Sequence, residues 1–191
     1  MSKGRLEVIC GPMASSKSEE LIWRLRRAQI AKQRVVAFRA IISERNRKGH
    51  ISSRGTGNFD AIDVLSVGDI IAAGREAQVI GIDEIQFFDD VKEELFEAVN
   101  RLMTYCCRVI ISGLDMDFLG KPFDITAYLM AMADHVEKRT AICTRCGQEA
   151  VLTQRLISGE PAPFDSPRKL SGSVPNVIYE PRCRGCHMVP K

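Results

Sequence analysis

Residues 11–18 constrain the fold of this chain more than any other segment. They read Gly-Pro-Met-Ala-Ser-Ser-Lys-Ser, follow the apolar run 6–9 and precede a helical pattern that begins at Glu19. A strand, a tight loop ending in Lys-Ser and then a helix is the context in which a phosphate-binding loop works, because the N–H groups and the dipole at a helix N-terminus favour negative charge. In such a loop Lys17 reaches the β- and γ-phosphates of a nucleotide, and the Ser18 hydroxyl lies on Mg²⁺.

One position in this loop departs from the usual pattern. Ser16 stands where a glycine normally precedes the lysine. Glycine allows a positive φ or a close approach of the backbone to phosphate, and a Cβ makes both harder. The alternative interpretation is an ordinary serine-rich N-terminus of a helix, and the rest of the sequence has to decide between the two.

Apolar runs typical of short buried strands alternate with helical patterns along most of the 191 residues. Strands are expected at 6–9, 35–38, 61–65, 79–82 and 109–111, and helices at 19–32, 67–75, 91–104 and 125–133. This alternation predicts an α/β fold of the P-loop nucleotide-binding kind, with a mostly parallel sheet flanked by helices.

Two segments interrupt the alternation. Residues 43–60 are rich in Arg, Asn, Gly and Ser, which predicts a long irregular loop. After Lys138 the composition changes to Cys, Arg, Pro and Gly, which indicates a boundary near residues 134–138. We therefore expect a nucleotide-binding domain over residues 1–137 and a small second domain over residues 138–191.

Two carboxylates, Asp83 and Glu84, follow the apolar strand at 79–82. Phosphoryl-transfer folds place an Asp at the end of such a strand, beside the phosphate loop, where it holds Mg²⁺. The next residue, Glu84, is suited to act as a base or to orient a water molecule. The alternative is that both acids cap the following helix.

The chain contains seven cysteines, and four of them form two C-x₂-C pairs. These four are expected to bind a structural Zn²⁺ through tetrahedral thiolates: Cys143, Cys146, Cys183 and Cys186. His187 is an alternative fourth ligand in place of Cys186. The remaining cysteines lie in or beside apolar strand patterns and are expected in the core: Cys10, Cys106 and Cys107.

The overall composition argues against two classes of partner. The net charge is only +3, from 27 basic and 24 acidic residues, which is too balanced to predict binding to nucleic acid or to a membrane surface. No apolar run approaches the roughly 20 residues that a spanning helix needs, and the N-terminus carries no signal-peptide pattern. We therefore expect a cytoplasmic protein with reduced or metal-bound cysteines.

Along nearly its whole length the sequence resembles the small, zinc-containing (type II) thymidine kinases. The phosphate loop matches that family's loop, and residues 82–88 match its D-E-x-Q-F-F signature. Residues 113–123 (Gly-Leu-Asp-Met-Asp-Phe-Leu-Gly-Lys-Pro-Phe) are similar to a third motif. Residues 153–155 (Thr-Gln-Arg), with Tyr179 ahead of the second cysteine pair, are similar to a fourth.

This resemblance implies ATP-dependent phosphorylation of the thymidine 5′-hydroxyl to give thymidine monophosphate in deoxynucleotide salvage. Glu84 would be the general base, and Asp83 and Ser18 would hold Mg²⁺. ATP would be bound by Gly11, Pro12, Met13, Ala14, Ser15, Ser16, Lys17, Ser18 and Arg45. The nucleoside would be bound by Met13, Phe87, Leu114, Phe118, Phe123, Thr153 and Tyr179. Zinc would fix the ends of a C-terminal lasso over the nucleoside, and the chain would form a homotetramer.

Several positions differ from the family pattern. Ala14 replaces a Phe, Ser16 a Gly, Ser43 an Asp, and Val174-Pro175 a Gly-Gly pair. These differences leave two alternatives open: a kinase with a shifted acceptor such as deoxyuridine, and a catalytically weak nucleotide-binding relic of the same fold. A zinc-ribbon nucleic-acid binder is a further alternative, suggested by four basic residues near the cysteines: Arg168, Lys169, Arg182 and Arg184.

Overall fold

A six-stranded sheet forms the centre of the computed structural model, which describes residues 4–41, 48–53, 55, 57–105, 108–168 and 176–190. Its strands lie in the order β5-β2-β6-β7-β1-β8, and every neighbouring pair is parallel. The bounds are β1 (Arg5–Gly11), β2 (Val35–Ala40), β5 (Ile62–Val64), β6 (Val79–Asp83), β7 (Arg108–Leu114) and β8 (His135–Lys138). The expected parallel α/β fold is confirmed.

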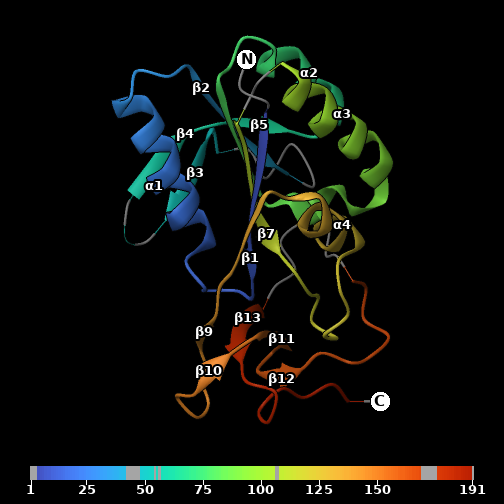
Figure 1. The fold of residues 1–191 in the computed structure, drawn as a ribbon. Helices are drawn as coiled ribbons and strands as arrows, with labels where there is room; N and C mark the ends of the chain where they lie inside the picture. Colours follow the sequence, from blue (N-terminus) through green and yellow to red (C-terminus); the bar gives the residue numbers. More distant parts are fainter. Residues whose placement is uncertain are drawn as a thin grey trace.

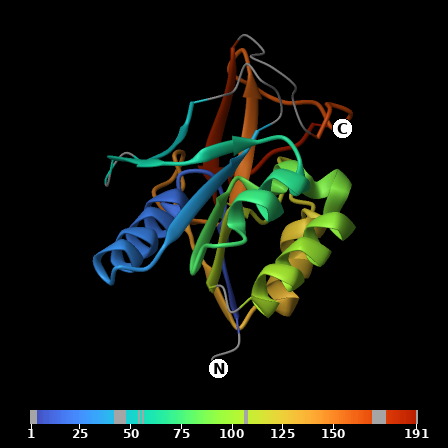
Figure 2. The same cartoon turned by 90° about the horizontal axis from the view of Figure 1, so that it is seen from above.

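Helices cover both faces of this sheet (Figures 1 and 2). They are α1 (Lys17–Ile30), α2 (Val67–Gly74), α3 (Lys92–Thr104) and α4 (Asp124–Met132), with the 3₁₀ segment η2 (Ile85–Val91). Successive strand residues point to opposite faces, so Ile9 packs in the cluster that contains α1 residues, whereas Val8 packs with residues of α2, α3 and α4. Both faces are therefore apolar, which explains why the strands read as continuous apolar runs.

The expected irregular loop over residues 43–60 is partly wrong. Residues 42–47 lie outside the described part of the chain, but β3 (His50–Ser53) and β4 (Gly57–Asp60) form an antiparallel hairpin. Ile51 and Phe59 face each other across this hairpin and are buried in the cluster that contains α1 residues. One apolar residue per strand is too few for a visible periodicity, so the pattern alone could not reveal these strands.

The main sheet includes the segment where the domain boundary is expected. β8 pairs with β1 from Glu7↔His135 to Cys10↔Lys138, so the main sheet extends through Lys138. Beyond it the chain forms two small antiparallel sheets, which lie at the carboxyl ends of the parallel strands (Figure 1). Their strands are β9 (Ala141–Ile142), β10 (Glu149–Ala150), β11 (Leu152–Ile157), β12 (Glu160–Pro161) and β13 (Val177–Arg182).

Among the described helices, none is both long and apolar enough to cross a membrane. Cys10 is fully buried in the core as expected. Cys106 and Cys107 lie outside the described residues.

Candidate active site and metal centre

The loop between β1 and α1 has the backbone of a tight anion-binding turn. Ser16 has φ 58° and Ala14 has φ 59°, so both occupy the left-handed region that favours glycine. Gly11 has φ 142°, and a Cβ there would come within 2.3 Å of the Arg139 carbonyl oxygen. Position 16, which usually carries glycine, thus needs a positive φ, and serine adopts this conformation at a cost in conformational free energy.

Lys17 opens α1, and its ammonium folds back onto the loop. Its Nζ donates to the Pro12 carbonyl oxygen at 2.6 Å and lies 3.4 Å from Ser15 Oγ. Burial lowers the pKa of Lys17, although nearby carboxylates, Glu84 and Asp83 foremost, oppose that shift. The lysine is a half-buried cation whose hydrogen-bond partners are neutral oxygens, an arrangement that favours an incoming anion.

Asp83 ends β6 and is almost fully buried. Burial, with the neighbouring carboxylate of Glu84, raises the pKa of Asp83 to about 6 despite hydrogen bonds from Ser112 and Ser18. The Ser112 hydroxyl on β7 donates to Asp83 Oδ1. The structure thus brings Asp83 and Ser18, the two expected Mg²⁺ ligands, together.

Glu84 has φ 59°, which is unusual for a residue with a side chain and is the kind of strain that concentrates at functional sites. Gln86 Nε2 donates to Glu84 Oε2 at 2.5 Å, and Gln86 Oε1 accepts from the Leu114 N–H at 3.0 Å. Gln86 is buried and therefore holds the carboxylate in one orientation. The sequence prediction gave Gln86 no role, although it is the glutamine of the D-E-x-Q-F-F signature.

A cavity of about 330 Å³ unites these groups. It is lined by Met13, Ala14, Ser15, Ser16, Lys17, Ser18, Glu19, Ser52, Ser53, Asp83, Glu84, Leu114 and Tyr179. The phosphate loop and the acidic pair thus open into one space, with Leu114 and Tyr179 beside them. Arg45, the other expected ATP ligand, lies outside the described residues.

Four expected nucleoside ligands are not among the residues that line this cavity. Phe87 packs against the core, and Thr153 is buried with its Oγ1 accepting from the Met13 N–H at 3.0 Å. Phe118 and Phe123 are buried beneath guanidinium groups, with Arg155 Cζ 3.9 Å from the first ring and Arg168 Cζ 4.4 Å from the second.

Arg139 links the phosphate loop to the start of the C-terminal segment. Its Nε donates to the Ser15 carbonyl oxygen at 2.9 Å, and its end nitrogen lies 2.6 Å from Glu137 Oε1 and 3.4 Å from Glu20 Oε2. Its N–H also donates to the Cys10 carbonyl oxygen at 2.8 Å. No sequence motif pointed to this residue.

The four cysteines of the two C-x₂-C pairs meet in space. Their sulfur atoms all lie within 4.8 Å of one another, and the Cys146 and Cys183 sulfurs are 3.6 Å apart. A tetrahedral Zn²⁺ with bonds of about 2.3 Å needs sulfurs about 3.8 Å apart, so this donor set suits zinc. His187 lies elsewhere, because its Nε2 is 2.9 Å from the Phe118 carbonyl oxygen.

The protonation of this cluster also fits a metal site. Burial opposes ionisation of Cys143, but backbone N–H groups, including those of Cys183 and Arg145, outweigh it and lower the pKa of this thiol to about 6. Hydrogen bonds with Cys146 and Cys183 raise the pKa of Cys186 to about 12. Four crowded sulfurs cannot all ionise without a cation, and a bound Zn²⁺ would allow it.

A comparison with known protein families identifies the family of this chain. The family model described as thymidine kinase matches residues 4–187, which is nearly the whole chain. The protein therefore belongs to the thymidine kinase family, whose activity is nucleoside phosphorylation.

Proposed function

We propose that this member of the thymidine kinase family transfers the γ-phosphoryl group of ATP to the 5′-hydroxyl of thymidine, giving thymidine monophosphate for deoxynucleotide salvage. One observation carries the proposal: the phosphate loop, Asp83 and Glu84 line the same cavity as Leu114 and Tyr179. Phosphoryl transfer needs positioning and charge neutralisation more than covalent chemistry, and these groups supply both.

Lys17 would bind the ATP phosphates. Its ammonium contacts the Pro12 carbonyl oxygen and Ser15 Oγ, which are neutral acceptors. A phosphate oxygen forms a stronger, charge-assisted hydrogen bond with an ammonium group. The lysine would therefore leave the loop for the nucleotide, while the N–H groups of residues 13–18 would surround its phosphates.

Asp83 and Ser18 would hold the Mg²⁺ that accompanies ATP and neutralises its phosphates. In the absence of a cation, burial favours the protonated form of Asp83. A divalent cation would favour the ionised form, so metal binding is expected to release this proton.

Glu84 would act as the general base. Its carboxylate would take the proton of the nucleoside 5′-hydroxyl as that oxygen forms its bond to the γ-phosphorus. The bond between the γ-phosphorus and the bridging oxygen breaks, and ADP leaves with the electron pair. Gln86 would keep the carboxylate aimed at the hydroxyl through its hydrogen bond to Oε2.

The nucleoside would occupy the part of the cavity beside Met13, Leu114 and Tyr179. A flat heterocycle favours apolar and aromatic walls with few polar groups. Phe87, Phe118, Phe123 and Thr153 are not among the residues that line this cavity, and we propose that they support its wall or turn toward the base when the nucleoside binds. Val174 and Pro175 lie outside the described residues.

The decisive experiment measures product from ATP, Mg²⁺ and either thymidine or deoxyuridine. We expect thymidine monophosphate from the wild type. In the Glu84→Gln variant we expect turnover to fall by about 10²-fold or more, with nucleotide binding preserved. Glu97→Gln changes an exposed glutamate on α3 and serves as the matched control.

Each other outcome selects one alternative. Faster formation of deoxyuridine monophosphate would establish the shifted acceptor. Nucleotide binding without any nucleoside monophosphate would establish the nucleotide-binding relic. Near-normal turnover in Glu84→Gln would remove Glu84 from the role of base.

Two further features belong to this proposal. Residues 138–191 would act as a zinc-binding unit that closes over the nucleoside, with zinc held by the four cysteines. Family membership supports a homotetramer, which light scattering of the purified protein would test.

A further inference from the structure

Arg168 connects the C-terminal part of the chain to two motif segments of the main domain. Its Nε donates to Asp117 Oδ2 at 2.8 Å, and an end nitrogen donates to Asp89 Oδ2 at 3.0 Å. The other end nitrogen donates to the Pro122 carbonyl oxygen. The Asp117 and Asp89 side chains are only 1% and 8% exposed and that of Arg168 is 34% exposed, so water screens these partly buried ion pairs less than it would pairs on the open surface.

The two carboxylates that receive Arg168 are themselves fixed by the backbone. Asp117 Oδ1 accepts from the N–H groups of Leu119 and Lys121 at 2.9 Å each. Asp89 Oδ1 accepts from the Ile125 N–H at the start of α4, at 2.8 Å. Arg168 therefore meets a rigid receptor, which lowers the entropy lost when its side chain is held there.

Arg155 on β11 also holds this segment, through its backbone carbonyl oxygens. This side chain is 2% exposed, and its end nitrogens donate to the carbonyl oxygens of Pro167 at 2.5 Å and of Arg168 at 2.7 Å. Its guanidinium carbon lies 3.9 Å from the centre of the Phe118 ring and 5.3 Å from that of Tyr179. Arg155 and Tyr179 are also direct partners in the β11–β13 pairing.

These contacts form a continuous path from Arg168 to the cavity. Arg168 anchors the chain to Asp117 and Asp89, Arg155 holds the carbonyl oxygens of Pro167 and Arg168, and the Arg155 guanidinium faces the Tyr179 ring. Tyr179 in turn lines the cavity that contains Glu84. None of these contacts involves the phosphate loop.

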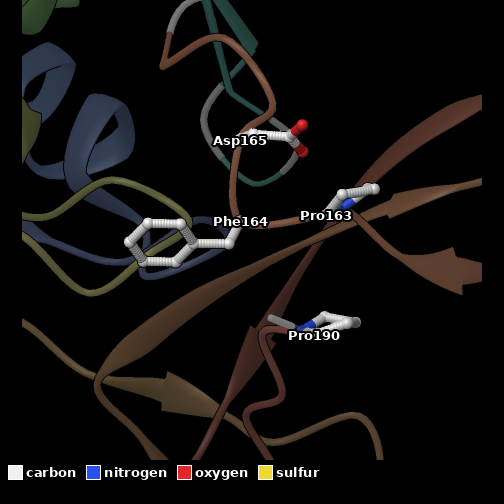
Figure 3. Close-up of a pocket in the computed structure, with 4 residues that line it drawn as sticks. All are labelled: Pro163, Phe164, Asp165 and Pro190. Carbon is white, nitrogen blue, oxygen red and sulfur yellow. The ribbon is translucent and has the colours of Figure 1, made fainter.

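Packing elsewhere along the segment is loose. Pro163, Phe164 and Asp165 line an open cavity of about 720 Å³ together with Pro190 (Figure 3). Phe164 is 49% exposed and is tied to the C-terminal stretch by its N–H, which donates to the Pro190 carbonyl oxygen at 3.0 Å. Phe164 also contacts the main domain, because Lys121 Nζ lies 5.1 Å from the centre of its ring. The Arg168 ion pairs are the contacts of residues 163–168 that reach nearly buried carboxylates of the main domain.

We propose that Arg168 is a positioning residue for the nucleoside acceptor. Together with Arg155 it forms a two-arginine clasp that holds residues 163–168 in place and keeps Tyr179 at the wall of the cavity. The proposal rests on the proposed function, since it assigns the nucleoside to the Tyr179 side of the cavity. Loss of the clasp therefore weakens use of the nucleoside and leaves use of ATP unchanged.

Steady-state kinetics test whether loss of the clasp affects the nucleoside and not ATP. In Arg168→Met we expect the KM for thymidine to rise about tenfold, a factor in keeping with the loss of charge-assisted hydrogen bonds, while the KM for ATP changes less than about twofold. Arg168→Lys keeps the charge but not the planar fork, so it should recover only part of the loss. Arg184→Met, which removes an exposed arginine near the cysteine cluster, is the matched control.

A second variant distinguishes an effect on nucleoside use from a folding defect. Asp89→Asn removes one of the two carboxylate charges that pair with Arg168, but the asparagine side chain can still accept from the Ile125 N–H. The variant should therefore fold normally and show a smaller rise in the KM for thymidine than Arg168→Met. Equal rises in both KM values, or a rise accompanied by a matching loss of folded protein, would show a purely structural role and overturn the proposal.

Amide hydrogen exchange tests the clasp without any substrate. Peptides within residues 153–168 should exchange faster in Arg168→Met than in the wild type, and at the wild-type rate in Arg184→Met. Unchanged exchange together with an unchanged KM for thymidine would overturn the proposal. If the wild type fails to phosphorylate thymidine, the proposed function fails, whereas the exchange measurement still decides whether the clasp exists.

Discussion

Ser16 occupies a left-handed backbone conformation at the N-terminus of α1, with φ 58° and ψ 29°. This conformation costs a residue with a side chain about 1–2 kcal/mol. This strain lies in the loop that is expected to surround phosphate. The Cβ of Ser16 also occupies space that a glycine would leave open for phosphate.

Replacing Ser16 with glycine is expected to stabilise the protein by about 0.5–1 kcal/mol, because relief of strain exceeds the added entropy of the unfolded chain. We also expect the Kd for ATP to fall about two- to fivefold, since the loop backbone gains access to phosphate. Calorimetry measures both effects.

Lys32→Gly is the matched control, because Lys32 has φ 57° near the end of α1, outside the residues that line the cavity. It should gain stability without a change in ATP binding. Weaker ATP binding in Ser16→Gly would mean that the serine itself contributes a contact.

Asp83 is a buried carboxyl whose ionisation costs folding free energy. Burial raises its pKa from 3.8 to about 6. Between these pH values the native state binds more protons than the unfolded state, so the contribution of Asp83 to stability decreases as pH rises across this window and does not recover above it.

Asp83→Asn should therefore increase the free energy of unfolding by on the order of 2 kcal/mol at pH 7.5, with a much smaller gain at pH 4.5. Urea unfolding at the two pH values measures this difference, and Asp60→Asn, at an exposed position, is the control. A gain that is equal at both pH values would contradict the assignment.

At the scale of elements, the β7–η2 contact places the candidate base. Gly113 on β7 lets η2 approach, because a Cβ there would lie 2.7 Å from Gln86 Oε1 and 2.7 Å from Ile85 Cγ2. Gln86 occupies this space and holds Glu84. The orientation of the carboxylate thus depends on the missing side chain of a residue on another element.

Gly113→Ala is expected to lower kcat by about tenfold or more, because displacement of Gln86 misaligns the base, and to change the KM for ATP little. Gly68→Ala on α2 is the matched control, since the nearest atom to its added Cβ is Ser66 Oγ at 3.8 Å. A normal kcat in Gly113→Ala would show that the alignment through Gln86 is dispensable.

At the scale of the whole molecule, the C-terminal sheets have little apolar core of their own. The cluster around the cysteines contains Ala141, Cys143 and Ala150, with Cys183 and Cys186 packed against it. Such a core cannot offset the entropy of ordering the chain, and metal binding supplies folding free energy in small domains of this kind.

Purified protein should therefore contain about one zinc per chain, and Cys183→Ser should lose it and expose residues 139–190 to proteolysis. His187→Ala should keep its zinc, because this ring contacts the Phe118 carbonyl oxygen. Cys10→Ser, at a buried cysteine of the main sheet that is not part of the cluster, should also keep it. Elemental analysis decides all three, and well under one zinc in the wild type would refute the metal site.

The sequence by itself determined the features that depend on short-range pattern. The phosphate loop, the Asp83–Glu84 pair and the two C-x₂-C pairs were visible because their chemistry needs particular residues a few positions apart, and the parallel sheet followed from apolar runs buried on both faces. Their geometric grouping in the structure agrees with those expectations. The roles of individual site residues stay predictions.

Only the tertiary structure decided which distant residues meet. Arg168 and Asp89 are 79 residues apart and Arg139 and Ser15 are 124 apart, and no local pattern encodes such pairs. The same holds for β8, whose exposed edge residues show no strand periodicity, and for Phe118 and Phe123, which pack under arginines instead of lining the cavity. Local sequence sets propensity and chemistry, whereas long-range contacts depend on how whole elements pack.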